Sequence, residues 1–114
     1  MIIQNSWESE IRLSFYNGFE KIPELYFDGN PYRDNGGTVD VENGFVIPAD
    51  SLVIIEYVEH FGPPKPYNPF TRYNRIVVED SSGNELDELG EKDFTLFQNG
   101  KYDFIYFLDY YPLE

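Results

Sequence analysis

The stretch EIRLSF, residues 10–15, decides the fold class, because polar and apolar residues alternate along it without a break. In a β-strand successive side chains point to opposite faces, so Ile11, Leu13 and Phe15 are predicted to share one buried face. We therefore predict a strand over residues 9–16.

Turn signals divide the rest of the chain into further short strands. Asn-Gly pairs, which supply the positive φ angles of type I′ turns, occur at 17–18, 35–36, 43–44 and 99–100, and Asp-Gly and Ser-Gly pairs occur at 28–29 and 82–83. The runs between them are rich in β-branched and aromatic residues, which suit a pleated, half-buried surface. Further strands are predicted over 22–27, 38–42, 45–47, 51–59, 74–79, 94–98 and 101–108.

Two pairs of these ranges are predicted to form hairpins, namely 38–42 with 45–47 and 93–98 with 101–108. In the last strand Tyr102, Phe104, Tyr106 and Leu108 share one face, and Ile105 and Phe107 lie on the other. Apolar residues on both faces indicate a central strand, or an edge strand that something else covers.

Two segments allow a helix as well as a strand. Residues 48–59 resemble an N-capped helix that ends at Gly62, but their β-branched and aromatic content favours a buried strand over 51–59. Residues 84–92 (NELDELGEK) place Leu86 and Leu89 at helical spacing, which is compatible with one short helical turn ending at Gly90.

The chain has 114 residues, which suits a single domain over 1–114. Seven or eight short strands, frequent turns and little helix predict an all-β, two-layer antiparallel β-sandwich, immunoglobulin-like or related. The chain has no cysteine, which excludes disulfides and thiolate chemistry and fits either a reducing compartment or a stable cell-surface domain. No run of eighteen apolar residues occurs, so no membrane-spanning segment is predicted.

The charge is strongly negative, with 8 basic and 21 acidic residues and a formal net charge of −13. Binding to nucleic acid or to anionic lipid depends on Lys and Arg that neutralise phosphates, so neither is a predicted partner. An acidic surface is compatible with a basic protein partner, with cations, or simply with solubility.

Residues that could carry chemistry are few and poorly arranged. His60 is the only histidine, and no serine lies in a G-x-S-x-G motif, so no nucleophilic triad is indicated. The acidic loop 28–37 departs from the EF-hand pattern, with Arg33 at the sixth position and Val39 at the twelfth, and residues 79–85 are typical of a hairpin turn. We predict no enzymatic activity, no catalytic or metal-binding residue and no cofactor.

Aromatic residues are the more informative feature, because ten Tyr and ten Phe exceed what a core of this size needs. Several of them lie in residues 60–75 (HFGPPKPYNPFTRYNR), where three prolines at 63, 64 and 66 exclude a central strand. This stretch is interpreted as a rigid crossover with Phe61 and Phe70 packed on the sandwich, or as a recognition loop if Tyr67 and Tyr73 point outward. The candidate interaction residues are Trp7, Tyr67, Phe70, Arg72, Tyr73, Tyr110 and Tyr111.

Several signals in series resemble small Bacteroidetes-type lipoprotein ectodomains. Residues 45–51 (FVIPADS) match an "I-P-A-x-S" entry into a strand, and Asn5 precedes the first long strand. An Asn-Gly hairpin at 99–100 leads into a Tyr-rich final strand at 102–106, although Phe107-Leu108 replaces a Thr-containing end and no lipobox cysteine is present. The resemblance implies a β-sandwich tethered to a cell envelope, with no assigned chemistry.

Two functions follow as hypotheses. The first is a non-enzymatic binding module of the bacterial envelope that contacts protein or carbohydrate, and homodimerisation through edge strands is compatible with it. The alternative is an acidic cytoplasmic inhibitor, an immunity or phage-encoded protein that blocks a basic, nucleic-acid-binding enzyme by charge complementarity. A removed targeting segment would favour the envelope, and a native start at Met1 would favour the cytoplasm.

Overall fold

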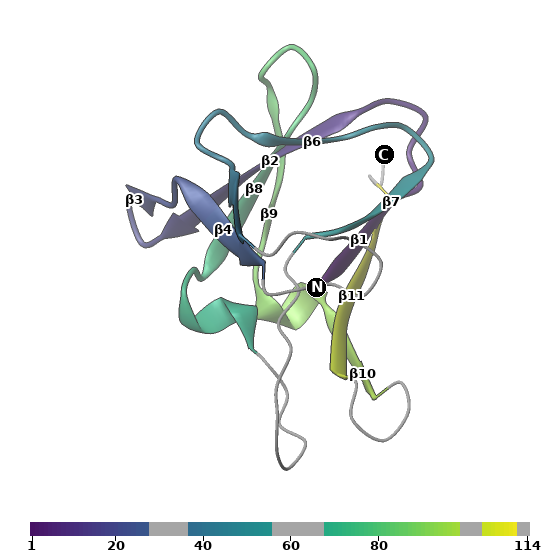
Figure 1. The fold of residues 1–114 in the computed structure, drawn as a ribbon. Helices are drawn as coiled ribbons and strands as arrows, with labels where there is room; N and C mark the ends of the chain where they lie inside the picture. The colour runs from purple at the N-terminus through teal and green to yellow at the C-terminus, as the bar shows by residue number, and fades with distance from the viewer. Residues whose placement is uncertain (28–36, 56–67, 99–103, 112–114) are drawn as a thin grey trace.

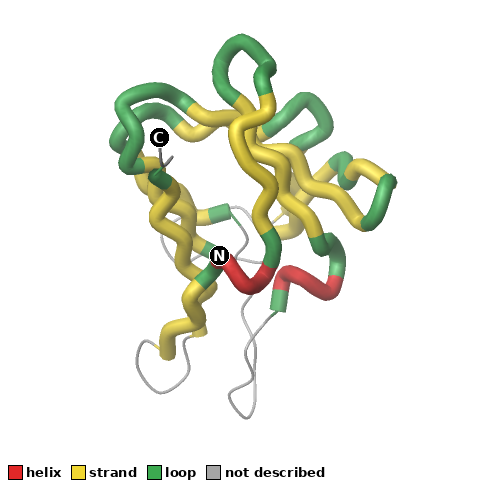
Figure 2. The backbone as a smooth tube through the Cα atoms, turned by 180° about the vertical axis from the view of Figure 1, so that it is seen from behind, coloured by secondary structure: helices red, strands yellow, loops and turns green. Residues whose placement is uncertain are grey.

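The structure, a computed structural model, describes residues 1–27, 37–55, 68–98 and 104–111 (Figure 1). Its strands form two larger sheets with one core of buried side chains, and a third sheet of two strands. Figure 2 shows the two larger sheets from behind as separate groups of strands. The predicted all-β, sandwich-like fold is confirmed.

The first sheet, called sheet A, contains the strands nearest the two chain ends. Its order is β10-β11-β1-β7. The bounds are β1 Ile2–Asn5, β7 Ser51–Ile54, β10 Thr95–Gln98 and β11 Phe104–Tyr110. The pairs β10–β11 and β1–β7 are antiparallel, but β1 and β11 are parallel. The expectation of an antiparallel sandwich therefore has one exception, which arises because β1 enters the sheet between two strands that are distant in sequence.

The second sheet, called sheet B, is centred on β2. Its order is β3-β2-β8-β9, and β6 also pairs with β2. Sheet C pairs β4 with β5. Of the two short 3₁₀ helices, η1 precedes β8, and η2 lies between β9 and β10. The bounds are β2 Ile11–Asn17, β3 Glu20–Lys21, β4 Glu24–Phe27, β5 Gly37–Asp40, β6 Phe45–Ile47, β8 Arg75–Glu79, β9 Glu85–Leu89, η1 Pro69–Thr71 and η2 Glu91–Asp93.

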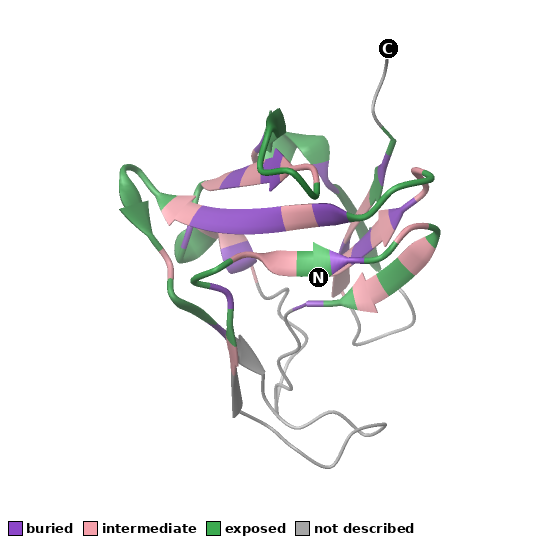
Figure 3. Ribbon diagram, turned by 90° about the horizontal axis from the view of Figure 1, so that it is seen from above, coloured by how far each residue is buried: buried purple, intermediate pink, exposed green. Residues whose placement is uncertain are grey.

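Strand β2 forms the centre of the core, as its alternation predicts. Ile11, Leu13 and Phe15 are fully buried, and the long buried band of β2 is visible in Figure 3. On β8, Val78 lies opposite Leu13 and Ile76 lies opposite Phe15, and both are fully buried as well. Apolar positions of period two thus meet across neighbouring strands, which is the main source of sheet stability.

Asn5 links the two sheets at the corner where the chain crosses between them. Its side chain is fully buried, and its Nδ2 donates to the carbonyl oxygens of Ser9 at 2.9 Å, Pro48 at 3.1 Å and Ile47 at 3.3 Å. Its Oδ1 accepts from the backbone N–H of Trp7 at 3.0 Å. One side chain therefore holds the β1–β2 connection against the β6–β7 connection.

The turn between β8 and β9 is built by Asp80, as the acidic, Ser- and Asn-rich sequence predicts. Asp80 Oδ1 accepts from the backbone N–H groups of Ser82 and Asn84, each at 2.9 Å, and Gly83 has a φ of +87°. The hydrogen bonds from Asn84 are the main cause of an Asp80 pKa below its ordinary value.

The predicted hairpin over 38–47 is wrong. Strand β5 pairs with β4 and strand β6 pairs with β2, so the two arms belong to different sheets. The turn itself is present, since the Gly44 N–H donates to the Val41 carbonyl at 3.0 Å and Gly44 has a φ of +91°. Val41 is fully buried, and its place in the core separates the two arms.

The segment 84–92 is mainly a strand, so the helical alternative is wrong for its first part. Residues 85–89 pair with β8, which buries Leu89 and leaves Leu86 exposed, and a 3₁₀ turn follows at 91–93. Residues 51–54 form a strand, as favoured, and 56–59 lie outside the described residues.

The eight predicted ranges correspond to β2, β4, β5, β6, β7, β8, β10 and β11. The expected seven or eight strands become eleven in the described residues, because β1, β3 and β9 were not predicted. These are two- to five-residue strands without a clear apolar alternation. The hairpin of β10 with β11 is confirmed, and β11 is a central strand with β10 and β1 on its two sides.

Candidate interaction surface

The structure divides the aromatic and basic candidates by burial. Tyr73 and Tyr110 are only 1% and 4% exposed, so neither side chain points outward as a contact residue would. Trp7 is half-buried and packs against the core, whereas Arg72 is exposed and Tyr111 is 63% exposed. Tyr67 lies outside the described residues, as do Phe61, His60 and the loop 28–36.

Phe70 has a structural role that explains the burial of Tyr73. Its ring makes edge contacts with Tyr73, Phe94 and Tyr106, at centroid distances of 5.7, 5.1 and 5.6 Å. Phe15 in sheet B contacts Tyr73 in the same way at 5.0 Å. The described end of the Pro-rich stretch is therefore fixed to the sandwich by aromatic packing, which agrees with the interpretation of a crossover.

Tyr106 and Tyr110, on β11, belong to the same interior. Burial, together with the nearby carboxylate of Glu91, raises the pKa of Tyr106, and its hydroxyl donates to Glu91 Oε1 at 3.3 Å. Burial, together with Asp87, raises the pKa of Tyr110. In both cases the largest cause is desolvation of the phenolate.

The opposite side of sheet A carries apolar residues that do not face the core. Directly paired residues share a face of the sheet, and the register links Phe107 with Ile2 and Ile54 across three strands. The same rule links Phe97 with Ile105, and Asp109 with Gln4 and Leu52. We call this surface the outer face of sheet A, and it consists of Ile2, Gln4, Leu52, Ile54, Thr95, Phe97, Ile105, Phe107 and Asp109.

The outer face is accessible as well as apolar. Leu52 and Phe97 are 53% and 49% exposed, and the rings of Phe97 and Phe107 contact each other at 6.0 Å. Along β7 the exposure alternates, with Ser51 and Val53 less exposed than Leu52 and Ile54, as Figure 3 shows. Large apolar side chains gathered on one solvent-facing sheet surface are typical of an interaction site.

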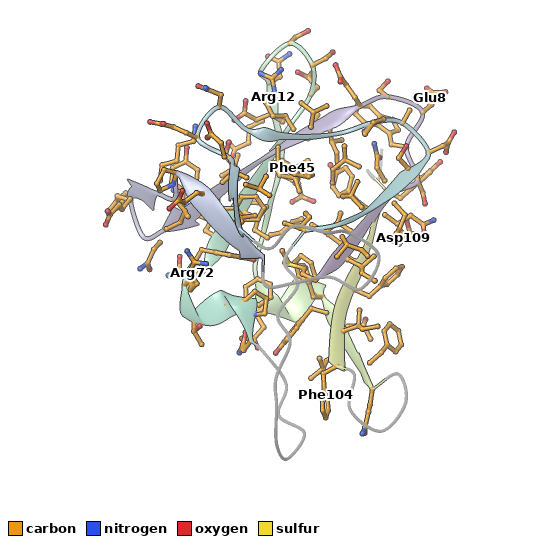
Figure 4. All side chains as sticks on the ribbon, in the orientation of Figure 1. Glu8, Arg12, Phe45, Arg72, Phe104 and Asp109 are labelled. Carbon is orange, nitrogen blue, oxygen red and sulfur yellow. The ribbon has the colours of Figure 1, made fainter. Side chains whose placement is uncertain are left out.

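One end of the outer face is polar and internally hydrogen-bonded. Gln4 Nε2 donates to Ser6 Oγ at 3.1 Å, and Ser6 Oγ donates to Asp109 Oδ1. These hydrogen bonds orient the carboxylate of Asp109 on β11, opposite Gln4 of β1 and away from Arg12 on β2 (Figure 4). The face thus combines an apolar area with one oriented negative charge.

The solvent-facing side of sheet B has a different character. Its β2 and β8 strands place Arg12 opposite Glu79 and Tyr16 opposite Arg75. The Arg75 guanidinium lies 4.6 Å from the Tyr16 ring centroid, and its Nε lies 3.8 Å from Glu88 Oε1. Val46, which lies opposite Arg12, is 43% exposed, so this side mixes charged and apolar residues, whereas the outer face of sheet A carries a single carboxylate.

The single largest exposure belongs to Phe19, which is 99% exposed at the β2–β3 turn. Gly18 precedes it with a φ of +64° and receives support from Asn74, whose Oδ1 accepts from the Gly18 N–H at 3.1 Å. Phe19 is isolated at a hairpin tip, and an isolated exposed apolar residue is ordinary on protein surfaces.

Sequence reasoning missed most of the outer face, namely Ile2, Leu52, Ile54 and Phe97. The available signal was the pair Ile105 and Phe107, which occupy the second face of an already apolar strand. Residues 1–27, 37–55, 68–98 and 104–111 contain no group of three potential metal ligands. Nor does any helix in these ranges have the length and hydropathy needed to cross a bilayer.

Comparison with known proteins adds no assignment: no protein-family model, curated protein or solved structure matches this chain.

Proposed function

We propose that this domain is a non-enzymatic protein-binding module that docks its partner on the outer face of sheet A. The observation that carries the proposal is the contrast between this mainly apolar face and the face of sheet B, on which Arg12, Arg75 and Glu79 are placed. Burying aromatic and aliphatic side chains at the centre of an interface supplies most of the binding free energy in protein complexes.

Protein is favoured over carbohydrate as the partner by the composition of the face. The aliphatic side chains of Ile2, Leu52 and Ile54 lie on the same face as its two phenylalanines, and it offers few hydrogen-bonding groups for sugar hydroxyls. Trp7, the aromatic residue best suited to stacking on a sugar, is packed against the core. By the resemblance to small lipoprotein ectodomains, the proposal extends to a domain displayed at a cell envelope.

Substitution of the face tests this function. We expect Leu52→Ser and Phe97→Ser, combined, to weaken binding of the partner at least about tenfold, because each removes an exposed apolar contact. The partner is isolated by quantitative capture from the source cells, purified, and titrated against wild-type and variant domains. Phe19→Ser, at the isolated hairpin tip, is the matched control and is expected to bind as the wild type does. Equal binding by the double variant would refute the assignment of this face.

A second candidate, an acidic inhibitor of a basic enzyme, is supported by the β8–β9 hairpin. Its exposed residues include Glu85, Asp87 and Glu88, within a chain of net charge −13. An inhibitor of this kind binds through the hairpin, and its association rate falls steeply as salt is raised. Partner binding that is insensitive to ionic strength and to Asp87→Asn would exclude it.

A further inference from the structure

Strand β7 forms one edge of sheet A, with β1 on one side and no strand on the other among the described residues. It spans Ser51–Ile54, and two of its four side chains, Leu52 and Ile54, belong to the outer face. An unpaired edge presents backbone donors and acceptors that accommodate another strand. Which groups it presents follows from the hydrogen bonding to β1.

The Ile55 N–H donates to the Met1 carbonyl at 2.9 Å, so these two opposite residues form a hydrogen-bonded pair. Bonded and non-bonded pairs alternate along an antiparallel ladder. Val53 is therefore bonded to β1, whereas Leu52 and Ile54 are at non-bonded positions. The N–H and C=O groups of Leu52 and Ile54 point away from β1, so the free edge of β7 offers one donor and one acceptor at each of these two residues.

This edge lacks the features that protect the β9 edge of sheet B. The sequence of β7 contains no charged residue and no proline. By contrast, the β9 edge of sheet B carries three carboxylates, at residues 85, 87 and 88, and the β8–β9 register is shifted at Val78/Glu79. Charges and bulges are the usual means of preventing strand addition, so the two edges are treated differently within one molecule.

Charge indicates the kind of strand that fits. The four described strands of sheet A contain no Lys or Arg, and their only charged residue is Asp109. Asp50 immediately precedes β7 and is exposed. A second copy of this chain would add another net charge of −13, and its own β7 contains no Lys or Arg. A segment of another protein with Lys or Arg beside its apolar residues would instead complement the negative charge of this domain.

We propose that β7 receives an extended segment of the partner protein as an additional strand of sheet A. The alternate side chains of this segment are apolar and continue the outer face beside Leu52 and Ile54, and Lys or Arg residues flank them. The inference rests on the proposed function, since it names how the partner of the same face is recognised.

A synthetic peptide provides the probe: eight residues alternating valine and threonine, with two lysines at each end. Two further versions carry N-methyl groups on all valines or on all threonines, which removes the N–H donors from one edge of the peptide only. We expect binding by the parent and by one methylated version, because only one peptide edge faces β7. Retained binding by both versions, or loss by both, would overturn backbone addition. A fourth peptide with glutamate in place of lysine is expected to bind at least tenfold more weakly.

Amide hydrogen exchange locates the peptide on the uniformly labelled domain. In the free protein the Leu52 and Ile54 amides are expected to exchange rapidly and the Val53 amide slowly. Saturating peptide is expected to slow exchange at Leu52 and Ile54 at least tenfold, and Phe19→Ser leaves this unchanged. Leu52→Pro removes one outward N–H donor and keeps the hydrogen bonds to β1, so it is expected to abolish peptide binding. Leu52→Lys places a positive charge on the edge and is expected to weaken peptide binding.

The outcomes separate this inference from the proposed function. If the two amides gain no protection while Leu52→Ser with Phe97→Ser still loses the partner, docking on the face stands and strand addition fails. If the two amides are already protected in the free protein and sedimentation shows a dimer, the occupant is a second copy and the inference is overturned. If peptide leaves the Leu52 and Ile54 amides unprotected and Leu52→Ser with Phe97→Ser binds the partner as the wild type does, both proposals fail.

Discussion

Replacement of Asn5 by alanine is expected to destabilise the fold strongly, because Asn5 joins the two crossings between the sheets. The three carbonyl acceptors of its Nδ2 share two hydrogens, and the Trp7 N–H adds a third bond. At about 1 kcal/mol of net stabilisation for each bond, the free energy of unfolding falls by about 3 kcal/mol. A domain of this size has a total stability of roughly 5–15 kcal/mol, so the loss is large.

Urea unfolding measures this loss, with far-UV circular dichroism and the fluorescence of Trp7, the only tryptophan, as two probes. With a slope of about 1.5 kcal/mol per molar urea, the midpoint falls by about 2 M. Gln4→Ala is the matched control, since Gln4 is the neighbouring residue, is half-exposed and bonds Ser6 Oγ alone in the described residues. A midpoint for Asn5→Ala within about 0.5 M of that control would refute the reasoning, by the same slope.

Asn5→Asp separates hydrogen bonding from packing, because the side chain keeps its shape. An ionised carboxylate would face three carbonyl oxygens, so the fold disfavours the ionised form and raises the pKa of the introduced group. The stability deficit relative to the wild type is therefore expected to be smallest below pH 4 and to grow as the pH rises toward 7. A deficit that does not change with pH would show that the amide donors contribute little.

Two further predictions concern a turn and a core tyrosine. Gly44→Ala is expected to lower the melting temperature more than Gly18→Ala. Both glycines have a positive φ, but only at Gly44 would the new Cβ overlap the Arg12 side chain. The difference in melting temperature should therefore vanish when both substitutions are made in an Arg12→Ala background. The pKa of Tyr106 is raised by burial and by Glu91, so Tyr106 is expected to remain neutral to a higher pH than ordinary tyrosine. Its contribution to the free energy of unfolding is therefore intact below about pH 10 and is lost as the pH rises above that value. Glu91→Gln should lower that pKa in an absorbance titration assigned with Tyr106→Phe, and an unchanged titration would contradict the contact.

The parts of the fold that could be predicted from the sequence are those with a local cause. The alternation over 10–15 fixes both the strand and its buried face, and the Asp, Ser and Asn residues at 80–84 bond their own backbone. The partners of each strand have no local cause. An Asn-Gly pair at 43–44 supplies a turn whichever strands flank it, and the burial of Val41 sends the two arms to different sheets.

The candidate site was harder to predict, because residue type is a poor guide to exposure in a thin sandwich. Tyr73 and Tyr110 were candidates because the amphipathic ring of tyrosine suits interfaces, yet a two-layer core needs large side chains to fill it, and both residues are buried. The exposed apolar residues of the outer face are instead Leu52, Ile54 and Phe97. Their assignment to one face requires the register of four strands, which includes a parallel pair between residues about a hundred positions apart.

The distribution of charge accounts for how such a face persists on an acidic protein. Fifteen carboxylate residues lie in the described ranges, and the strands of sheet A hold one of them, Asp109. The remainder lie on sheet B, sheet C and the turns, where they keep the molecule soluble and repel other copies at long range. Repulsion between the negative charges opposes association of this apolar face with the same face of a second copy. Attraction favours its association with a positively charged surface. Under the proposed function, the charge distribution that opposes self-association therefore also favours a basic, apolar partner.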